Sequence, residues 1–162
     1  MADSMAQLYQ QVILDHARER HGAGEIEPFH GESFQVNPTC GDEVRLRVEL
    51  AESPDGPRIA RVGWVGQGCS ISQASLSVLT DLVTGADVRT AEEVGEVFRQ
   101  LMHGRGAELE PDQQDILGDG AAFTGVARYV ARIKCALLGW MALRDALAHA
   151  LTAEPSTQEE NT

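Results

Sequence analysis

Residues 43–65, EVRLRVELAESPDGPRIARVGWV, decide the fold that the rest of the chain must accommodate. From Glu43 to Leu50 charged and apolar side chains alternate strictly, which predicts a strand with one buried face. Residues 59–65 alternate in the same way, and Pro54-Asp55-Gly56-Pro57 between them is a turn signal. The stretch therefore predicts an antiparallel β-hairpin.

The hairpin predicts where two cysteines lie. Antiparallel pairing brings the outer ends of the two strands to the same edge. Cys40-Gly41-Asp42 precedes the first strand, and Gly66-Gln67-Gly68-Cys69 follows the second. Because glycine permits tight turns beside each sulfur, we expect the hairpin to deliver Cys40, Asp42 and Cys69 to one edge.

The third cysteine, Cys135, is expected in the first turn of a last helix at about residues 132–151. The positive end of that helix, together with Arg132 and Lys134, favours a thiolate. A single cysteine is more often a small buried apolar residue than a ligand, so the interpretation depends on the group. Three thiolates and one carboxylate form a set that tetrahedral zinc accepts: Cys40, Asp42, Cys69 and Cys135.

The rest of the chain supplies helices and connections. Apolar periodicity predicts helices over about 4–20, 70–84 and 90–103, the last of them capped by Thr90. Residues 33–36 are expected to form a short strand, and 108–125 a loop with a short helical turn. Residues 1–151 are predicted to be one domain, and residues 152–162 a disordered acidic tail.

Composition excludes some classes of function. The 162 residues carry a net charge of −12 without a cluster of lysine and arginine, which argues against a nucleic-acid partner. No apolar stretch approaches the length of a membrane span, so no membrane association is expected. The three cysteines cannot all pair within the chain, and a reducing cytoplasmic location is expected, where thiols bind metal or react.

Histidine and tryptophan are not assigned to the predicted centre. Trp64 and Trp140 are expected in the core. All five histidines are expected to be surface or packing residues and not ligands: His16, His21, His30, His103 and His149.

Three motifs resemble one known family. NPTCGD at 37–42, GQGCSIS at 66–72 and RIKCALLGW at 132–140 resemble the Fe–S cluster assembly proteins of the IscU/NifU N-terminal superfamily, in its SufU branch. The resemblance covers about residues 5–150, with the motifs in the family's order. It implies an α+β fold with a small antiparallel sheet and helices packed on one side, in agreement with the hairpin and helices above.

The resemblance also implies that Cys40, Asp42, Cys69 and Cys135 are the metal ligands. The IscU branch has a histidine before the third cysteine, where this chain has Lys134. The separation of Cys69 and Cys135 is long, and no segment like the LPPVK chaperone-docking motif lies between them. These departures favour a zinc-binding sulfur acceptor over a plain scaffold.

The implied role is to take persulfide sulfur from a pyridoxal-phosphate-dependent cysteine desulfurase of the SufS kind. The sulfur then passes to a cluster-building complex of the SufBCD kind, which makes the chain a sulfur carrier more than a turnover enzyme. Cys40 is the expected acceptor because Pro38 and Gly41 flank it in a mobile turn, and Cys135 is its rival. Arg132 and Lys134 are expected to offset the negative charge of the metal site.

Two other functions stay open at this point. The first is a scaffold that binds iron and assembles an Fe–S cluster on Cys40, Cys69 and Cys135. The second is a structural zinc domain that only mediates protein contacts. The oligomeric state and the final acceptor of the sulfur or cluster do not follow from the sequence.

Overall fold

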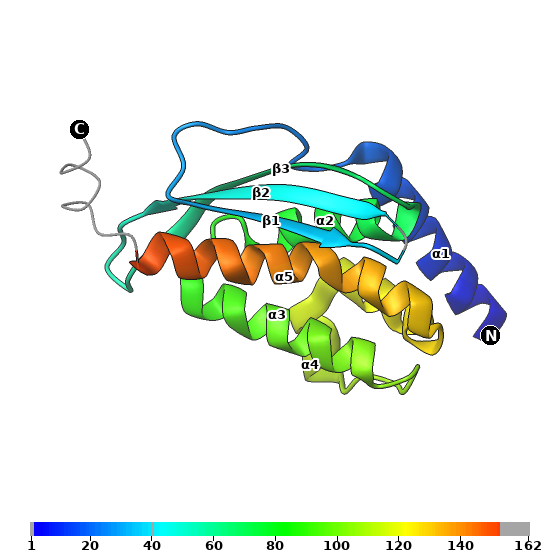
Figure 1. Cartoon of the computed structure of the whole chain (residues 1–162). Helices are drawn as coiled ribbons and strands as arrows, with labels where there is room; N and C mark the ends of the chain where they lie inside the picture. The colour runs from blue at the N-terminus through cyan, green and yellow to red at the C-terminus, as the bar shows by residue number, and fades with distance from the viewer. Residues whose placement is uncertain (1, 40, 153–162) are drawn as a thin grey trace.

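The computed structural model describes residues 2–39 and 41–152, which form an α+β fold (Figure 1). Three antiparallel strands form a sheet in the order β1-β2-β3, and helices supply the rest of the structure. The elements in chain order are α1 (Ala2–Glu19), β1 (Gly31–Asn37), β2 (Asp42–Ala51), β3 (Arg58–Gln67), α2 (Ser70–Val83), α3 (Val88–His103), α4 (Pro111–Leu117), the 3₁₀ helix η1 (Gly118–Arg128) and α5 (Val130–Thr152).

The predicted hairpin is confirmed as β2 and β3. Glu43 pairs with Gln67 and Leu46 with Trp64, so the start of β2 lies beside the end of β3. Of the apolar side chains of β2 that alternate in the sequence, Val44, Leu46 and Val48 are fully buried, and Leu50 is partly buried. β1 pairs with the other side of β2, where Asn37 is the partner of Asp42. The edge that the hairpin predicts is therefore present.

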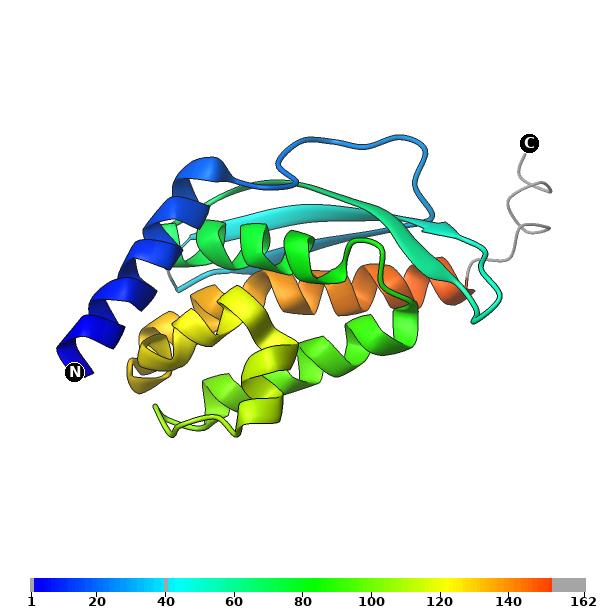
Figure 2. The ribbon, with the colours of Figure 1, turned by 180° about the vertical axis from the view of Figure 1, so that it is seen from behind.

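The helices cover one face of the sheet, as expected. α2 and α5 pack against the strands, α1 packs on α2, and α3 with η1 packs on α5 (Figure 2). On the opposite face, the connection between α1 and β1 arches over the strands (Figure 1). Its ends are fixed by hydrogen bonds from Gly24 N to Trp64 O at 2.7 Å and from His30 N to Val48 O at 2.8 Å.

Both tryptophans lie in the core, as predicted. Trp64 is fully buried under the sheet, and its indole N–H donates to His21 O at 2.8 Å. Trp140 stacks on Phe98 with ring centroids 4.9 Å apart, and its indole N–H donates to Ser75 Oγ at 3.1 Å. These bonds satisfy the polar edges of large buried rings.

The segment expected to be mostly loop is helical. α4 and η1 together occupy residues 111–128. Pro111 stands at the first helical position, and Glu110 and Gln113 form a capping box, so the sequence contains start signals for α4. η1 has no capping side chain at its start, and it is stabilised by burial of Phe123 and Val126 against the core.

Two predicted helix starts need correction. Asp87, and not Thr90, caps α3, since its side chain accepts a hydrogen bond from Thr90 N at 2.7 Å. α5 begins at Val130, which places Cys135 in the second helical turn instead of the first. The amide at Cys135 is therefore inside the helix, and the effect of the helix terminus on its thiol is weaker than expected.

The structure describes the end of the last helix but not the predicted tail that follows it. α5 continues to Thr152, one residue into the segment predicted to be a tail. The remainder of that prediction, for 153–162, lies outside the described residues. Among the helices that the structure describes, none combines the length and apolar character needed to cross a bilayer.

Candidate metal centre

Asp42 is the buried carboxylate of the centre. It opens β2, and only 1% of its surface is exposed. Its Oδ1 accepts a hydrogen bond from Cys69 N at 3.0 Å, and its Oδ2 lies 3.7 Å from Cys69 Sγ. A buried carboxylate is stable only when hydrogen bonds or cations compensate its charge. Asp42 therefore links the start of the hairpin to the residue that precedes α2.

Cys69 is the residue before α2. Its backbone is extended, with φ −73° and ψ 170°, and its side chain does not cap the helix. Instead Ser72 Oγ donates to Cys69 O at 3.0 Å, which fixes the turn into the helix. The half-buried sulfur stands at the positive end of a 14-residue helix, where negative charge is favoured.

Gly68 leaves room for the Asp42 carboxylate. A Cβ atom at this position would overlap Asp42 Oδ1 and lie 2.7 Å from Ser72 Oγ. Both neighbours belong to the site, and Asp42 is too deeply buried to move away. Glycine is therefore required here by close approach to the carboxylate, which explains the residue before Cys69.

We expect Gly68→Ala to weaken metal binding at this centre by about tenfold to a hundredfold, because it displaces an oriented carboxylate. Competition with a zinc chelator measures the change. Gly95→Ala is the matched control, since a Cβ there meets only Trp140 at 3.5 Å, an ordinary contact. Equal affinities for the two variants would show that Gly68 does not shape the site.

Cys135 completes the described part of the centre. It lies on α5 with 3% of its surface exposed, and its Sγ is 3.8 Å from Ala131 O. One donor atom from each of Asp42, Cys69 and Cys135 lie within 4.8 Å of one another. β2, the start of α2 and α5 thus converge on one small volume, and the structure brings together three of the four residues that are predicted to be ligands.

The donor set fits zinc. Two sulfurs and a carboxylate oxygen are ligand types that zinc combines in tetrahedral sites. Sulfur atoms on one zinc ion lie about 3.8 Å apart, given Zn–S bonds of about 2.3 Å. Donor atoms within 4.8 Å need only a small inward movement to reach this spacing. The same residues also suit an iron–sulfur cluster, which is held by thiolates.

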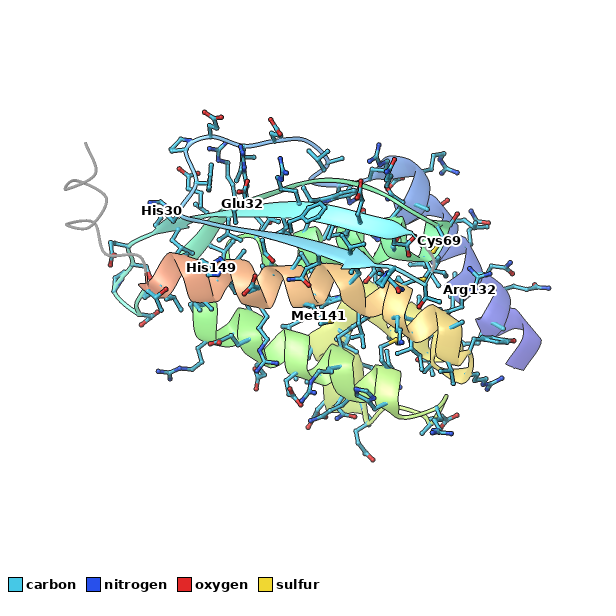
Figure 3. The ribbon with its side chains drawn as sticks, viewed as in Figure 1. His30, Glu32, Cys69, Arg132, Met141 and His149 are labelled. Atoms are coloured by element: carbon cyan, nitrogen blue, oxygen red, sulfur yellow. The ribbon has the colours of Figure 1, made fainter. Side chains whose placement is uncertain are left out.

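The remaining predicted site residues are Cys40, Arg132 and Lys134. Cys40, the fourth predicted ligand and the expected sulfur acceptor, lies outside the described residues. Arg132 and Lys134 are exposed on the first turns of α5, and Figure 3 shows Arg132 at the same end of the molecule as Cys69. Within residues 2–39 and 41–152, neither of these two side chains forms a hydrogen bond or ion pair, so their role stays a prediction.

A second group of possible ligands was not predicted. One donor atom each of His16, His21 and Asp81 also lie within 4.8 Å of one another. His16 is buried, whereas His30, His103 and His149 are exposed, as expected of surface residues. No spacing rule joins positions 16, 21 and 81, because packing of α1 on α2 brings them together.

The fold and the centre together define a class of protein. It is a small α+β domain in which two cysteines and a buried aspartate lie together at one end of the sheet. These side chains are suited to bind a metal ion, and the cysteine thiolates are suited to accept sulfur. Residues 8–136 match the family model described as the NifU-like N terminal domain. The chain belongs to this family.

Several relatives resemble the chain over most of its length. It is 40% identical over 144 residues to "Zinc-dependent sulfurtransferase SufU" of Bacillus subtilis (strain 168), covering 87% of this chain and 90% of that protein. It is 34% identical over 153 residues to "Iron-sulfur cluster assembly scaffold protein IscU" of Streptococcus pyogenes serotype M1, covering 94% and 90%. A solved structure titled as a putative iron-sulfur cluster assembly scaffold protein for the SUF system, from Fervidobacterium islandicum AW-1, gives a TM-score of 0.70 at 33% identity, covering 85% and 94%.

Proposed function

We propose that the chain is a zinc-dependent sulfur acceptor in Fe–S cluster assembly, which receives sulfur from the persulfide of a cysteine desulfurase. The observation that carries the proposal is the convergence of Asp42, Cys69 and Cys135, with donor atoms within 4.8 Å. The likeness to a relative named a zinc-dependent sulfurtransferase supports the choice of zinc and of sulfur transfer.

Bound zinc would keep the cysteine sulfurs deprotonated at neutral pH and would be held by Cys40, Asp42, Cys69 and Cys135. The sulfur transfer itself joins an acceptor thiolate to the outer sulfur of the donor's persulfide. The S–S bond of the donor breaks as the new S–S bond forms, and the donor cysteine leaves as a thiolate. One S–S bond is formed for each one broken, so the transfer needs no added oxidant or reductant.

Burial bears on which cysteine accepts the sulfur. Cys135 is 3% exposed and lies inside the second turn of α5, so a donor protein cannot reach its sulfur in this conformation. Cys69 is half-buried, and its backbone is held by Asp42. These constraints favour Cys40 over Cys135 as the acceptor.

The proposed partners follow from the same chemistry. The donor is a pyridoxal-phosphate-dependent cysteine desulfurase of the SufS kind, and the receiver of the sulfur is a cluster-building complex of the SufBCD kind. We place the protein in the cytoplasm, because this exchange requires thiols that a reducing compartment keeps unoxidised.

Two measurements on one preparation test the proposal. Metal content is determined after purification without oxygen, and desulfurase turnover is then measured with and without the protein. We expect about one tightly bound zinc ion at the thiolate centre and strongly increased turnover, both lost in Cys69→Ser. Removal of zinc without loss of turnover activation would contradict the proposal and favour a structural zinc domain.

The likeness to proteins named IscU scaffolds supports a second candidate. Cys40, Cys69 and Cys135 would then hold an Fe–S cluster in place of zinc. Reconstitution with iron and sulfide distinguishes the two functions. Visible absorbance of a stable cluster, with no activation of the desulfurase, would favour the scaffold.

A further inference from the structure

Histidine and carboxylate side chains gather where the end of α1 meets α2, apart from the thiolate centre. The group contains His16, His21 and Asp81, one donor atom of each lying within 4.8 Å of the others. Cys69 precedes α2, whereas Asp81 lies in its last turn. Twelve residues of helix rise about 18 Å, so the two groups are well separated along α2.

His16 is oriented as a metal ligand requires. The ring is buried, and its Nε2 lies 2.9 Å from Asp119 Oδ2 on η1. Because an ionised carboxylate can only accept, Nε2 donates to Asp119. Ser77 Oγ already accepts from His21 N at 3.0 Å, so its hydroxyl is available to donate to the lone pair of His16 Nδ1 at 2.8 Å. A carboxylate on the far nitrogen is the arrangement that fixes histidine ligands in metal sites.

His21 repeats this arrangement. Its Nε2 lies 3.1 Å from Glu19 Oε1, and its Nδ1 lies 2.8 Å from Asp81 Oδ2. Because the Asp81 carboxylate can only accept, Nδ1 donates to it, and this bond raises the pKa of His21 above its ordinary value. Each histidine thus has one nitrogen on a carboxylate outside the group, Asp119 or Glu19, while the other contacts Ser77 in the case of His16 and Asp81 in the case of His21.

We infer that His16, His21 and Asp81 form a second metal site, which takes a divalent transition-metal cation such as zinc through imidazole nitrogen and carboxylate oxygen. Two imidazoles and one carboxylate are a ligand set that zinc accepts, with a fourth position for water. The cation replaces the proton on His21 Nδ1, which is released to solvent. Asp119 and Glu19 keep their bonds to the far nitrogens.

Binding at this second metal site has a structural consequence. His16 belongs to α1, His21 follows it, and Asp81 belongs to α2, so the cation would join two helices that otherwise meet through packing and hydrogen bonds. A cation that binds only the folded chain raises its stability by mass action. Zinc bound at this site, which contains no sulfur, would therefore raise the melting temperature of the protein.

Equilibrium dialysis of the full chain against zinc at neutral pH tests the inference. We expect His21→Gln and Asp81→Asn each to bind one zinc ion fewer per chain than the unsubstituted protein. The side chains of His21 and Asp81 are 38% and 48% exposed, and melting in chelator checks that the variants fold. His103→Gln, which alters an exposed histidine at the end of α3, is the matched control and should bind as many zinc ions as the unsubstituted protein.

Cobalt spectra assign the lost ion to a site. The thiolate-to-cobalt charge-transfer band reports only the cysteine centre, so we expect it to be unchanged in His21→Gln and Asp81→Asn. The inference is wrong if both variants bind as much zinc as the unsubstituted protein. It is equally wrong if the lost ion is accompanied by loss of the thiolate band, because the ion then belongs to the cysteine centre. Neither result depends on whether the chain accepts sulfur.

Discussion

Asp42→Ala is expected to lower zinc affinity at the thiolate centre by at least about a hundredfold and to slow sulfur acceptance correspondingly. Loss of a residue that merely orients a ligand already lowers affinity by about ten- to a hundredfold, and Asp42 is itself a donor. The substitution also removes the acceptor of the Cys69 amide, which is 3.0 Å from Asp42 Oδ1. Chelator competition and the rate of persulfide formation measure the two effects.

A second substitution at the same position separates charge from position. Asp42→Asn keeps an oxygen that can accept from Cys69 N but removes the negative charge, so an intermediate affinity is expected. Asp115→Ala, at an exposed acid of α4, is the control for a general loss of negative charge. If Asp42→Ala binds zinc as tightly as the control, Asp42 is not a ligand and the described centre reduces to two cysteines.

Gly31→Ala is expected to destabilise the fold by about 3 kcal/mol or more, the upper range for overpacking a close contact. Gly31 begins β1 at the point where the strand crosses α5. A Cβ atom there would overlap Ala146 O and lie 2.9 Å from Ala150 N, both of them backbone atoms of the helix. Because backbone atoms cannot rotate away, the strand and helix must separate. Urea unfolding measures the loss of stability.

The control for this variant is Gly125→Ala, where a Cβ atom meets nothing within 4 Å. Its free energy of unfolding should stay within about 0.5 kcal/mol of the unsubstituted value, as for most surface substitutions. Similar midpoints for Gly31→Ala and Gly125→Ala would mean that β1 and α5 do not approach as closely as described.

Local patterns are sufficient to predict the hairpin and the proximity of two residues of the candidate metal centre. Strict alternation in 43–50 leaves one register with a buried face, and the turn at 54–57 fixes which ends meet. The sequence therefore predicts that Asp42 and Cys69 lie together. No pairing rule links Cys135 to them, only the chemistry of the donor set, and the predicted start of its helix is wrong by two residues.

Other features depend on tertiary packing that no local pattern contains. η1 has glycines at 118, 120 and 125 and is held by burial of Phe123. The second metal site draws His16, His21, Asp81 and Asp119 from three separate parts of the chain, and only the packing of α1 against α2 and η1 unites them. The sequence predicts that Gly68 permits a tight turn. In the structure, glycine is required at this position mainly because a Cβ atom would overlap the Asp42 carboxylate.

The proposed sulfur transfer is tested most directly by mass spectrometry of the zinc-loaded protein after anaerobic incubation with a cysteine desulfurase and cysteine. We expect one added sulfur atom that reductant removes, located on the peptide containing Cys40. Sulfur on Cys135 but never on Cys40 would overturn the choice of acceptor. Absence of added sulfur from Cys40, Cys69 and Cys135 alike, while the desulfurase turns over, would contradict the proposed sulfur transfer itself.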